Sequence, residues 1–191
     1  ERAGRYATAG TSAVAMLAAL SPDFAMAQKV KPDDARIKAE RVVIDSPSGN
    51  GRINAYVTRP ANATGPLPVV LVAHENRGLN PHIEDVTRRL ALENFIAVAP
   101  DALTTAGGYP GDEDKAREAF AKLDLRKVAD DFVASAAWAR KAPGGNGKLG
   151  AVGFCYGGGV VNMLATRVTE RAAGAPFYGS APSLDAVGNI K

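Results

Sequence analysis

Uncharged apolar runs separate amphipathic stretches in the middle of the chain. Residues 69–73 (VVLVA) and 95–99 (FIAVA) carry no polar side chain, which is typical of strands buried on both faces of a sheet. Between these runs, residues 81–93 place apolar side chains at helical spacing. Asn80, a preferred helix-capping residue, stands immediately before this segment and is followed by proline. The pattern predicts a strand, a helix and a second strand.

The same alternation continues toward the C-terminus. Residues 113–141 are predicted to be helical with a break near Asp124, and one face of the second half is expected to enter the core: Leu125, Val128, Phe132 and Ala136. The remaining elements are a loop over 101–112, a turn over 143–147, a strand over 148–153, a helix over 156–166 and a strand over 172–178. Strands that alternate with helices predict an α/β fold with a mostly parallel sheet and helices on both faces.

The N-terminal third of the chain has a different pattern. Residues 40–45 and 52–59 are rich in Val, Ile and Tyr, and the Pro-Ser-Gly-Asn-Gly cluster between them favours a turn. We therefore expect an antiparallel hairpin ahead of the parallel strands. Residues 30–34 are polar and contain a proline, so we expect them to form a linker into the folded domain.

An uncharged segment rich in alanine precedes this linker. Residues 7–20 follow Arg2 and Arg5 and are followed by Ala-Met-Ala at 25–27, which is the order of a secretory signal peptide. The alternative is an Ala-rich helix that packs on the domain. We therefore separate residues 1–29, an export signal or helical segment, from the domain at 30–191. A signal would place the protein outside the cytoplasm, in the periplasm of a bacterium; without it the protein would be cytoplasmic.

Composition excludes several functional classes. The 191 residues are 46% hydrophobic and 23% charged, with a net charge of +3 that is not gathered into a basic stripe. We therefore expect a soluble domain that does not bind nucleic acid. Two histidines and one cysteine show no metal-ligand spacing, so we expect neither a metal nor a cofactor.

The single cysteine lies in a pattern that indicates catalysis. Cys155 stands between Gly153 and Gly157 in a G-x-C-x-G motif, after a predicted strand and before a predicted helix. This is the nucleophile-elbow pattern with Cys in place of Ser, in the structural context that the motif requires. The glycines are expected where backbone segments approach closely, and the helix N-terminus favours the thiolate. We therefore interpret Cys155 as a nucleophile and not as a packed core thiol.

Three segments in order along the chain resemble a known family. They are residues 70–83 (VLVAHENRGLNPHI), 97–101 (AVAPD) and 153–158 (GFCYGG). Together they resemble the dienelactone hydrolase family, from about Glu40 to the C-terminus. The resemblance implies an α/β-hydrolase fold and thiol-based hydrolysis of a small ester or lactone.

The resemblance also implies roles for individual residues. Cys155 would be the nucleophile, and Glu75 would hold the resting thiol and help to deprotonate it. The backbone N–H groups of Asn76 and Tyr156 would form the oxyanion hole, an assignment that also follows from the geometry of a nucleophile elbow beside the first strand-to-helix loop.

The chain departs from the family pattern in two ways. Residues 102–109 contain no Arg or Lys where members that act on dienelactone place an arginine, so we expect small uncharged esters to be better substrates. No histidine follows His82, and Asp185 does not stand at the end of a strand. His74 precedes the nucleophile, which is the wrong order for the catalytic base, so we interpret it as a strand-end residue and His82 as a surface residue.

We therefore expect residues 30–191 to be an incomplete α/β-hydrolase domain that lacks its C-terminal part, with the triad Asp and His outside this chain. The 191 residues alone are not expected to turn over substrate. The strand at 172–178 would form an open sheet edge, which invites a separate C-terminal fragment or self-association. The alternative function is a non-catalytic binding or interaction module in which the elbow is a structural turn.

Overall fold

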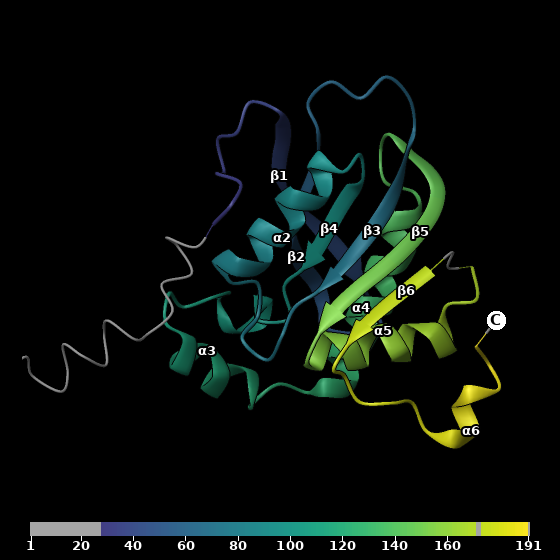
Figure 1. The fold of residues 1–191 in the computed structure, drawn as a ribbon. Coiled ribbons are helices and arrows are strands. Elements are labelled where there is room, and N and C mark those ends of the chain that lie inside the picture. Colours follow the sequence, from purple (N-terminus) through teal and green to yellow (C-terminus); the bar gives the residue numbers. More distant parts are fainter. Residues whose placement is uncertain (1–27, 171–172, 191) are drawn as a thin grey trace, which may run out of the picture.

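The computed structural model describes residues 28–170 and 173–190 (Figure 1). Six strands form one sheet in the order β1-β2-β4-β3-β5-β6. The strands are β1 (Ile37–Ser46), β2 (Gly51–Pro60), β3 (Leu67–Ala73), β4 (Ile96–Pro100), β5 (Gly145–Phe154) and β6 (Ala173–Phe177). The helices are α2 (Pro81–Leu92), α3 (Glu113–Phe120), α4 (Leu125–Arg140), α5 (Tyr156–Arg167) and α6 (Leu184–Val187), with a 3₁₀ turn, η1 (Thr104–Ala106).

The pairing of the strands confirms the predicted sheet. β1 and β2 form an antiparallel hairpin, and β2 pairs antiparallel with β4. The other three pairings, β3 with β4, β3 with β5 and β5 with β6, are all parallel. The sheet is therefore parallel through its centre and antiparallel at the β1 end, as an α/β-hydrolase fold requires.

Helices cover the two faces of the sheet. α4 and α5 pack on one face, where Phe132 and Leu164 join a core with Val69 and Leu71 of β3. α2 packs on the opposite face, where Ile83 joins Val72 and residues of β2 and β4. The alternation of β3 side chains between two cores explains why its sequence is continuously apolar.

The predicted helix boundaries are largely confirmed. The N–H of Ile83 donates to the Asn80 side chain at 3.0 Å, so Asn80 caps α2 as expected. Asp124 likewise caps α4 and separates it from α3. Val128, Phe132 and Ala136 are buried, but the placement of Leu125 in the core is wrong, because it is the first residue of α4 and its side chain is 48% exposed.

Two loops differ from the prediction. The segment at 143–147 is not a turn throughout, because β5 already begins at Gly145, with a register irregularity opposite Leu67 and Val69. Positive φ values of 79° and 82° at Gly144 and Gly147 allow the chain to turn and then to pair early. The loop at 101–112 contains η1, which apolar periodicity does not signal in so short a segment.

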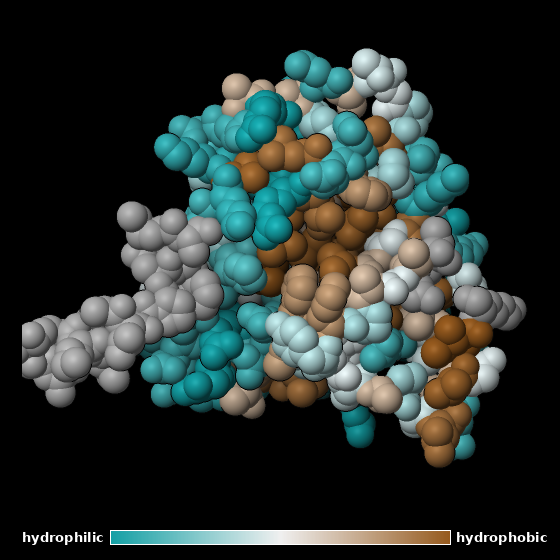
Figure 2. Space-filling model, in the orientation of Figure 1, coloured by the Kyte–Doolittle hydropathy of each residue, from teal (hydrophilic) through white to brown (hydrophobic). Residues whose placement is uncertain are grey.

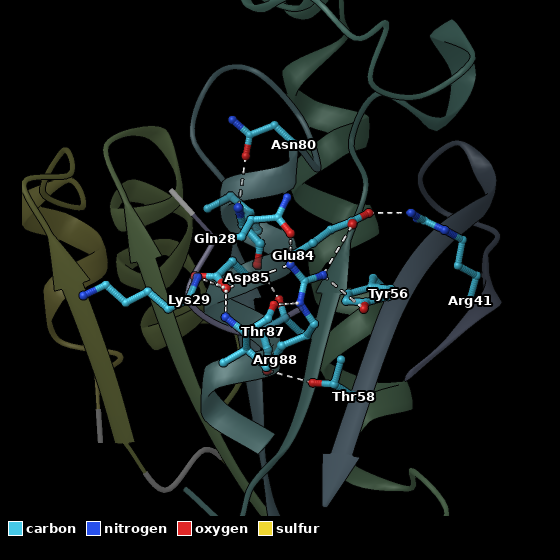
Figure 3. Close-up of polar contacts among 12 residues, drawn as sticks. Gln28, Lys29, Arg41, Tyr56, Thr58, Asn80, Glu84, Asp85, Thr87 and Arg88 are labelled. Carbon is cyan, nitrogen blue, oxygen red and sulfur yellow. Dashed lines mark hydrogen bonds and ion pairs between the residues drawn. The ribbon is translucent and has the colours of Figure 1, made fainter. Parts of the chain in front are cut away.

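The expectation of a linker at residues 30–34 is wrong at its first residue. Val30 is buried, and its N–H donates to Asp85 Oδ1 at 2.8 Å while its carbonyl accepts from Arg88 Nε at 2.7 Å. Figure 3 labels Asp85 and Arg88, the two side chains that make these bonds. The segment is fixed because its backbone donors and acceptors pair with side chains of α2. Residues 1–27 of the segment assigned to an export signal or helix (1–29) lie outside the described part of the chain. No helix of the described part is long and apolar enough to cross a membrane.

Candidate active site

Cys155 forms a sharp turn between β5 and α5. Its backbone has φ 54° and ψ −116°, a conformation that residues with a side chain rarely adopt, and its side chain is exposed. Its N–H donates to the carbonyl of Phe177 at 3.1 Å, and its carbonyl accepts from the N–H of Gly159 at 3.3 Å. The strained conformation is therefore held by β6 on one side and by α5 on the other.

The two glycines of the motif lie where backbones touch. A Cβ on Gly153 would stand 2.1 Å from the carbonyl oxygen of Gly157, and a Cβ on Gly157 would stand 2.1 Å from the carbonyl oxygen of Ala73. Both obstacles are backbone atoms of packed elements, which cannot move aside as a flexible side chain would. The elbow therefore requires glycine at both positions, and it lies directly against the end of β3.

The loop after β3 carries Glu75 and Asn76, both half-buried. The loop is fixed at its far end, where the N–H of Leu79 donates to Asp101 Oδ1 at 3.2 Å. Gly78 has a φ of +71°, and a Cβ there would stand 2.5 Å from Leu103, so the loop bends tightly against the start of the next loop. Glu75 and Asn76 therefore lie on a tightly bent loop beside the elbow.

Tyr178 joins this group, although no motif or pattern in the sequence selects it. Its hydroxyl donates to Glu75 Oε1 across 3.5 Å, a long contact. Burial, the neighbouring charge of Glu75 and that of Cys155 together raise the pKa of Tyr178. Tyr178 therefore lies within electrostatic reach of both residues. In the sequence, Tyr178 is predicted to be the last residue of an apolar strand. Only the fold brings its side chain from the end of β6 to Glu75.

The backbone N–H of Tyr156 is available at the start of α5. It is the first residue of the helix, where N–H groups have no partner within the helix. Its ring packs edge-on against Phe120 at 4.8 Å between centroids. Burial, with a smaller effect of the Asp131 charge, raises the pKa of Tyr156 to about 12, so the phenol stays neutral and serves packing.

The histidines have different environments. His74 is fully buried at the end of β3, as expected of a strand-end residue, and burial lowers its pKa. His82 is half-buried in α2 and lines a groove with Val86 and Phe154, so the expectation of a surface residue holds only in part. Across the described ranges, 28–170 and 173–190, no three His, Cys, Asp or Glu side chains come together as a metal site would require.

A polar cluster that the sequence did not reveal borders the loop after β3. Glu113, at the start of α3, forms an ion pair with Arg77 at 2.9 Å and accepts hydrogen bonds from Tyr109 Oη at 2.8 Å and Asn80 Nδ2 at 3.1 Å. Burial and the bond to Glu113 raise the pKa of Tyr109 to about 12. A cation therefore stands next to Asn76, but its charge is balanced by Glu113.

The profile of the dienelactone hydrolase family matches residues 53–191, which is most of the chain. This chain belongs to the dienelactone hydrolase family. A protein of Escherichia coli K12 named "Putative carboxymethylenebutenolidase" is 35% identical over 152 residues, which are 78% of this chain and 55% of that protein. Another E. coli K12 protein, "Putative hydrolase fragment YghX", is 47% identical over 113 residues, which are 59% of this chain and 97% of that protein.

Solved structures give the same family. The crystal structure of a "Putative Dienelactone Hydrolase" from Klebsiella pneumoniae has 31% identity and a TM-score of 0.62, and the match covers 78% of this chain and 65% of that one. A "Dienelactone Hydrolase-like Promiscuous" phosphotriesterase, P91, has 25% identity and a TM-score of 0.68, with 82% and 66% covered. Seven curated relatives named "Putative carboxymethylenebutenolidase" are matched over 47% to 61% of their length, so this chain spans about half of each of them.

Proposed function

We propose that this chain supplies the nucleophile of a thiol-dependent hydrolase of small esters or lactones. The observation that carries the proposal is the exposed Cys155 in a strained turn at the N-terminus of α5. The partial positive charge of a helix N-terminus favours a thiolate, and the thiolate is the reactive form of cysteine. A cysteine with a purely structural role has no need of this conformation.

In the proposed reaction the Cys155 sulfur attacks the carbonyl carbon of the substrate. The carbonyl oxygen becomes an oxyanion that accepts hydrogen bonds from the N–H groups of Asn76 and Tyr156. The C–O bond then breaks, the alcohol leaves with a proton, and water hydrolyses the thioester. Glu75, with Tyr178 at its carboxylate, would hold the resting thiol and take its proton. The triad Asp and His would come from polypeptide outside these 191 residues.

The substrate is proposed to be small and uncharged. Residues 102–109 contain no Arg or Lys, and Arg77, on the loop after β3, is paired with Glu113. A substrate carboxylate would therefore have to compete with Glu113 for the guanidinium of Arg77. Comparing kcat/KM for neutral aryl esters and an anionic lactone tests this choice, and a clear preference for the anionic lactone would contradict it.

The thiol test separates the hydrolase from a binding module that keeps the elbow only as a turn. An ordinary thiol is only a few per cent ionised at pH 7, so an environment that stabilises the thiolate would speed alkylation by iodoacetamide about tenfold. We expect native Cys155 to react at least that much faster than glutathione. The matched control is the same protein in denaturant, which should react like glutathione. Equal rates in the native and denatured states would favour the binding module.

For location, we propose export with cleavage near Ala27, and we take the bond after Ala27 as the position to test. Such a cut would leave in place the bonds that hold the next residues, in which Arg88 donates to Gln28 Oε1 at 2.9 Å and the N–H of Lys29 donates to Asp85 at 3.0 Å. The mass of the protein isolated from its native cell should therefore correspond to a chain that starts at Gln28. A mature protein that retains residues 1–27 would overturn this proposal.

A further inference from the structure

His74 is a buried titratable residue to which the proposed reaction gives no role. Its side chain is fully inaccessible, and its ring meets Phe120 and Phe132 edge-on, at 6.2 and 5.8 Å between centroids. It precedes Glu75 and Asn76 directly in the chain. A polar ring in such apolar surroundings is costly unless both of its nitrogens are paired.

The two hydrogen bonds of His74 determine its tautomer. Nδ1 lies 2.6 Å from the carbonyl oxygen of Glu75, and because a carbonyl can only accept, Nδ1 carries the proton. The N–H of Ala102 donates to Nε2 at 3.1 Å, so Nε2 carries the lone pair. The ring is therefore neutral, and burial lowers its pKa in agreement. Neither nitrogen is left to act as a general base toward Cys155.

The bond to Glu75 fixes more than a carbonyl group. The Glu75 carbonyl and the Asn76 N–H belong to one peptide unit, which is trans, since the described residues contain no cis peptide bond. In a planar trans peptide the C=O and N–H point in opposite directions. A bond that holds the Glu75 carbonyl toward the buried imidazole therefore directs the Asn76 N–H away from the core.

We propose that His74 is a positioning residue, which orients the Asn76 N–H as an oxyanion donor through the peptide between Glu75 and Asn76. This inference rests on the proposed function. The imidazole also joins the ends of two parallel strands, because its other bond goes to Ala102 just beyond β4.

The second proposed donor is fixed against the same strand end. The first turn of α5 packs against Ala73 and His74, which directly precede Glu75 and Asn76. A Cβ on Gly157 would stand 2.1 Å from the carbonyl oxygen of Ala73 and 2.7 Å from that of His74. Tyr156 directly precedes Gly157, so the close packing of Gly157 also restricts the position of the Tyr156 N–H. The peptide oriented by His74 and the start of α5 therefore share one rigid support, which is what an oxyanion hole needs.

Two substitutions separate the two hydrogen bonds. In His74→Asn the side-chain amide can replace Nδ1 and donate to the Glu75 carbonyl, but it cannot reach Ala102. In His74→Gln the longer side chain can place its oxygen at the position of Nε2 and accept from Ala102, but it leaves the Glu75 carbonyl without its donor. Each variant loses one buried hydrogen bond, so the pair is matched for structural damage.

The measurement is a single acylation of Cys155 in the purified protein as its gene encodes it. With p-nitrophenyl acetate the thiolate attacks the carbonyl carbon, the ester C–O bond breaks and p-nitrophenolate leaves, giving one equivalent of yellow product and an acetyl thioester. Loss of an oxyanion donor lowers such rates by about 10²- to 10³-fold. We expect a loss of that size in His74→Gln and a loss below about tenfold in His74→Asn.

Alkylation by iodoacetamide is the control in the same samples. It displaces iodide at a saturated carbon and develops no oxyanion, so its rate should stay within about twofold of the wild type in both variants. Equal acylation rates in His74→Gln and the wild type would overturn the role of His74, as would equal losses in the two variants or a parallel fall in alkylation. A wild type that is alkylated rapidly but never acylated would instead overturn the proposed function.

Discussion

The strands at the two edges of the sheet, β1 and β6 (Figure 1), differ in length and in charge. At one edge β1 has ten residues, pairs along its whole length with β2, and exposes charged side chains such as Lys38, Glu40 and Arg41. At the other edge β6 has five residues, all exposed, and its sequence AGAPF contains no charge. Charges on an edge strand oppose pairing with a second chain, and β6 lacks this protection.

The faces near the two edges differ as well. Near β1 and β2 the guanidinium of Arg88 is fully buried and donates to the Val30 carbonyl, to Tyr56 Oη at 3.3 Å and to Gln28 (Figure 3). Asp85, an ion-pair partner of Arg88 at 4.0 Å, binds the backbone of the same N-terminal segment. This clamp, made of Gln28, Val30, Tyr56, Asp85 and Arg88, ties the segment to α2 and β2.

On the α2 face beside β6, by contrast, apolar residues line an open groove of about 340 Å³ over β3, β5 and β6. Figure 2 shows apolar side chains gathered at the centre of this view. The groove includes Val70, Val152 and Ala175. The elbow depends on this less protected side, since the N–H of Cys155 donates to Phe177 of β6. We therefore expect the clamp to contribute more to the stability of the fold, and changes at β6 to disturb the geometry of the site more strongly.

The largest effect is expected from breaking the clamp. Arg88→Met removes the donor from three acceptors and leaves the Asp85 carboxylate without its cation, and loss of one partner of a buried pair typically costs about 3 to 5 kcal/mol. Urea denaturation should show a loss of this size. The matched control is Arg41→Met, because the side chain of Arg41 is 61% exposed and its pair with Glu84 should contribute less than about 1 kcal/mol. Equal losses in the two variants would refute the clamp.

A pair of adjacent glycines compares the two sides directly. A Cβ on Gly157 would meet Ala73 in the centre of the sheet, whereas a Cβ on Gly158 would meet Phe177 and Gly179 at 2.5 and 2.9 Å, beside the open edge. Overpacking costs about 1 to 3 kcal/mol and occasionally more, and the cost falls where neighbours can move. We expect about 3 kcal/mol for Gly157→Ala and about 1 kcal/mol for Gly158→Ala in urea denaturation. The reverse order would show that β6 is the more rigid neighbour.

Acid should lower the stability of the fold through His74, which is buried at the centre of the sheet. Burial holds the pKa of His74 below its usual 6.5, despite the opposing charges of Asp101 and Glu75, so below pH 6.5 the unfolded chain binds a proton that the folded chain does not. The free energy of unfolding should therefore decrease as the pH is lowered, by up to about 1.4 kcal/mol per pH unit. Urea denaturation between pH 7.5 and 5.5 measures the slope. His74→Gln should be flatter over this window, and parallel profiles would contradict the assignment.

A substitution in β6 is expected to have the smallest effect on stability, but it should alter the association of the protein with other chains. We propose that this edge pairs with another polypeptide, either a separate C-terminal fragment or a second copy. Ala175→Lys places a charge on the exposed strand and should lower self-association in sedimentation velocity, with less than about 0.5 kcal/mol change in stability. Ala39→Lys, on the exposed and already charged β1, is the matched control and should change neither quantity. Identical sedimentation of both variants and the wild type would exclude self-pairing through β6.

The sequence by itself determined most of the helices and strands and the position of the elbow. Apolar runs such as residues 69–73 predict buried strands because strands between two layers of helices expose neither face to water. Asn80 predicts a helix start because its side chain satisfies a backbone donor within the next three residues. The G-x-C-x-G motif indicates a turn before any contact is known, since its glycines report close backbone approach. These signals are local, so they can be read without the fold.

Only the tertiary structure decided which distant groups meet. The docking of Val30 on Asp85 and Arg88 joins positions more than fifty residues apart, and no periodicity reports it. Tyr178 reaches Glu75 only because β6 lies beside β5. The two partners of His74 give the same lesson, because its ring bonds one carbonyl next to it in sequence and one N–H on another strand end. Burial and hydrogen bonding depend on what packs around a group, and that is a property of the assembled chain.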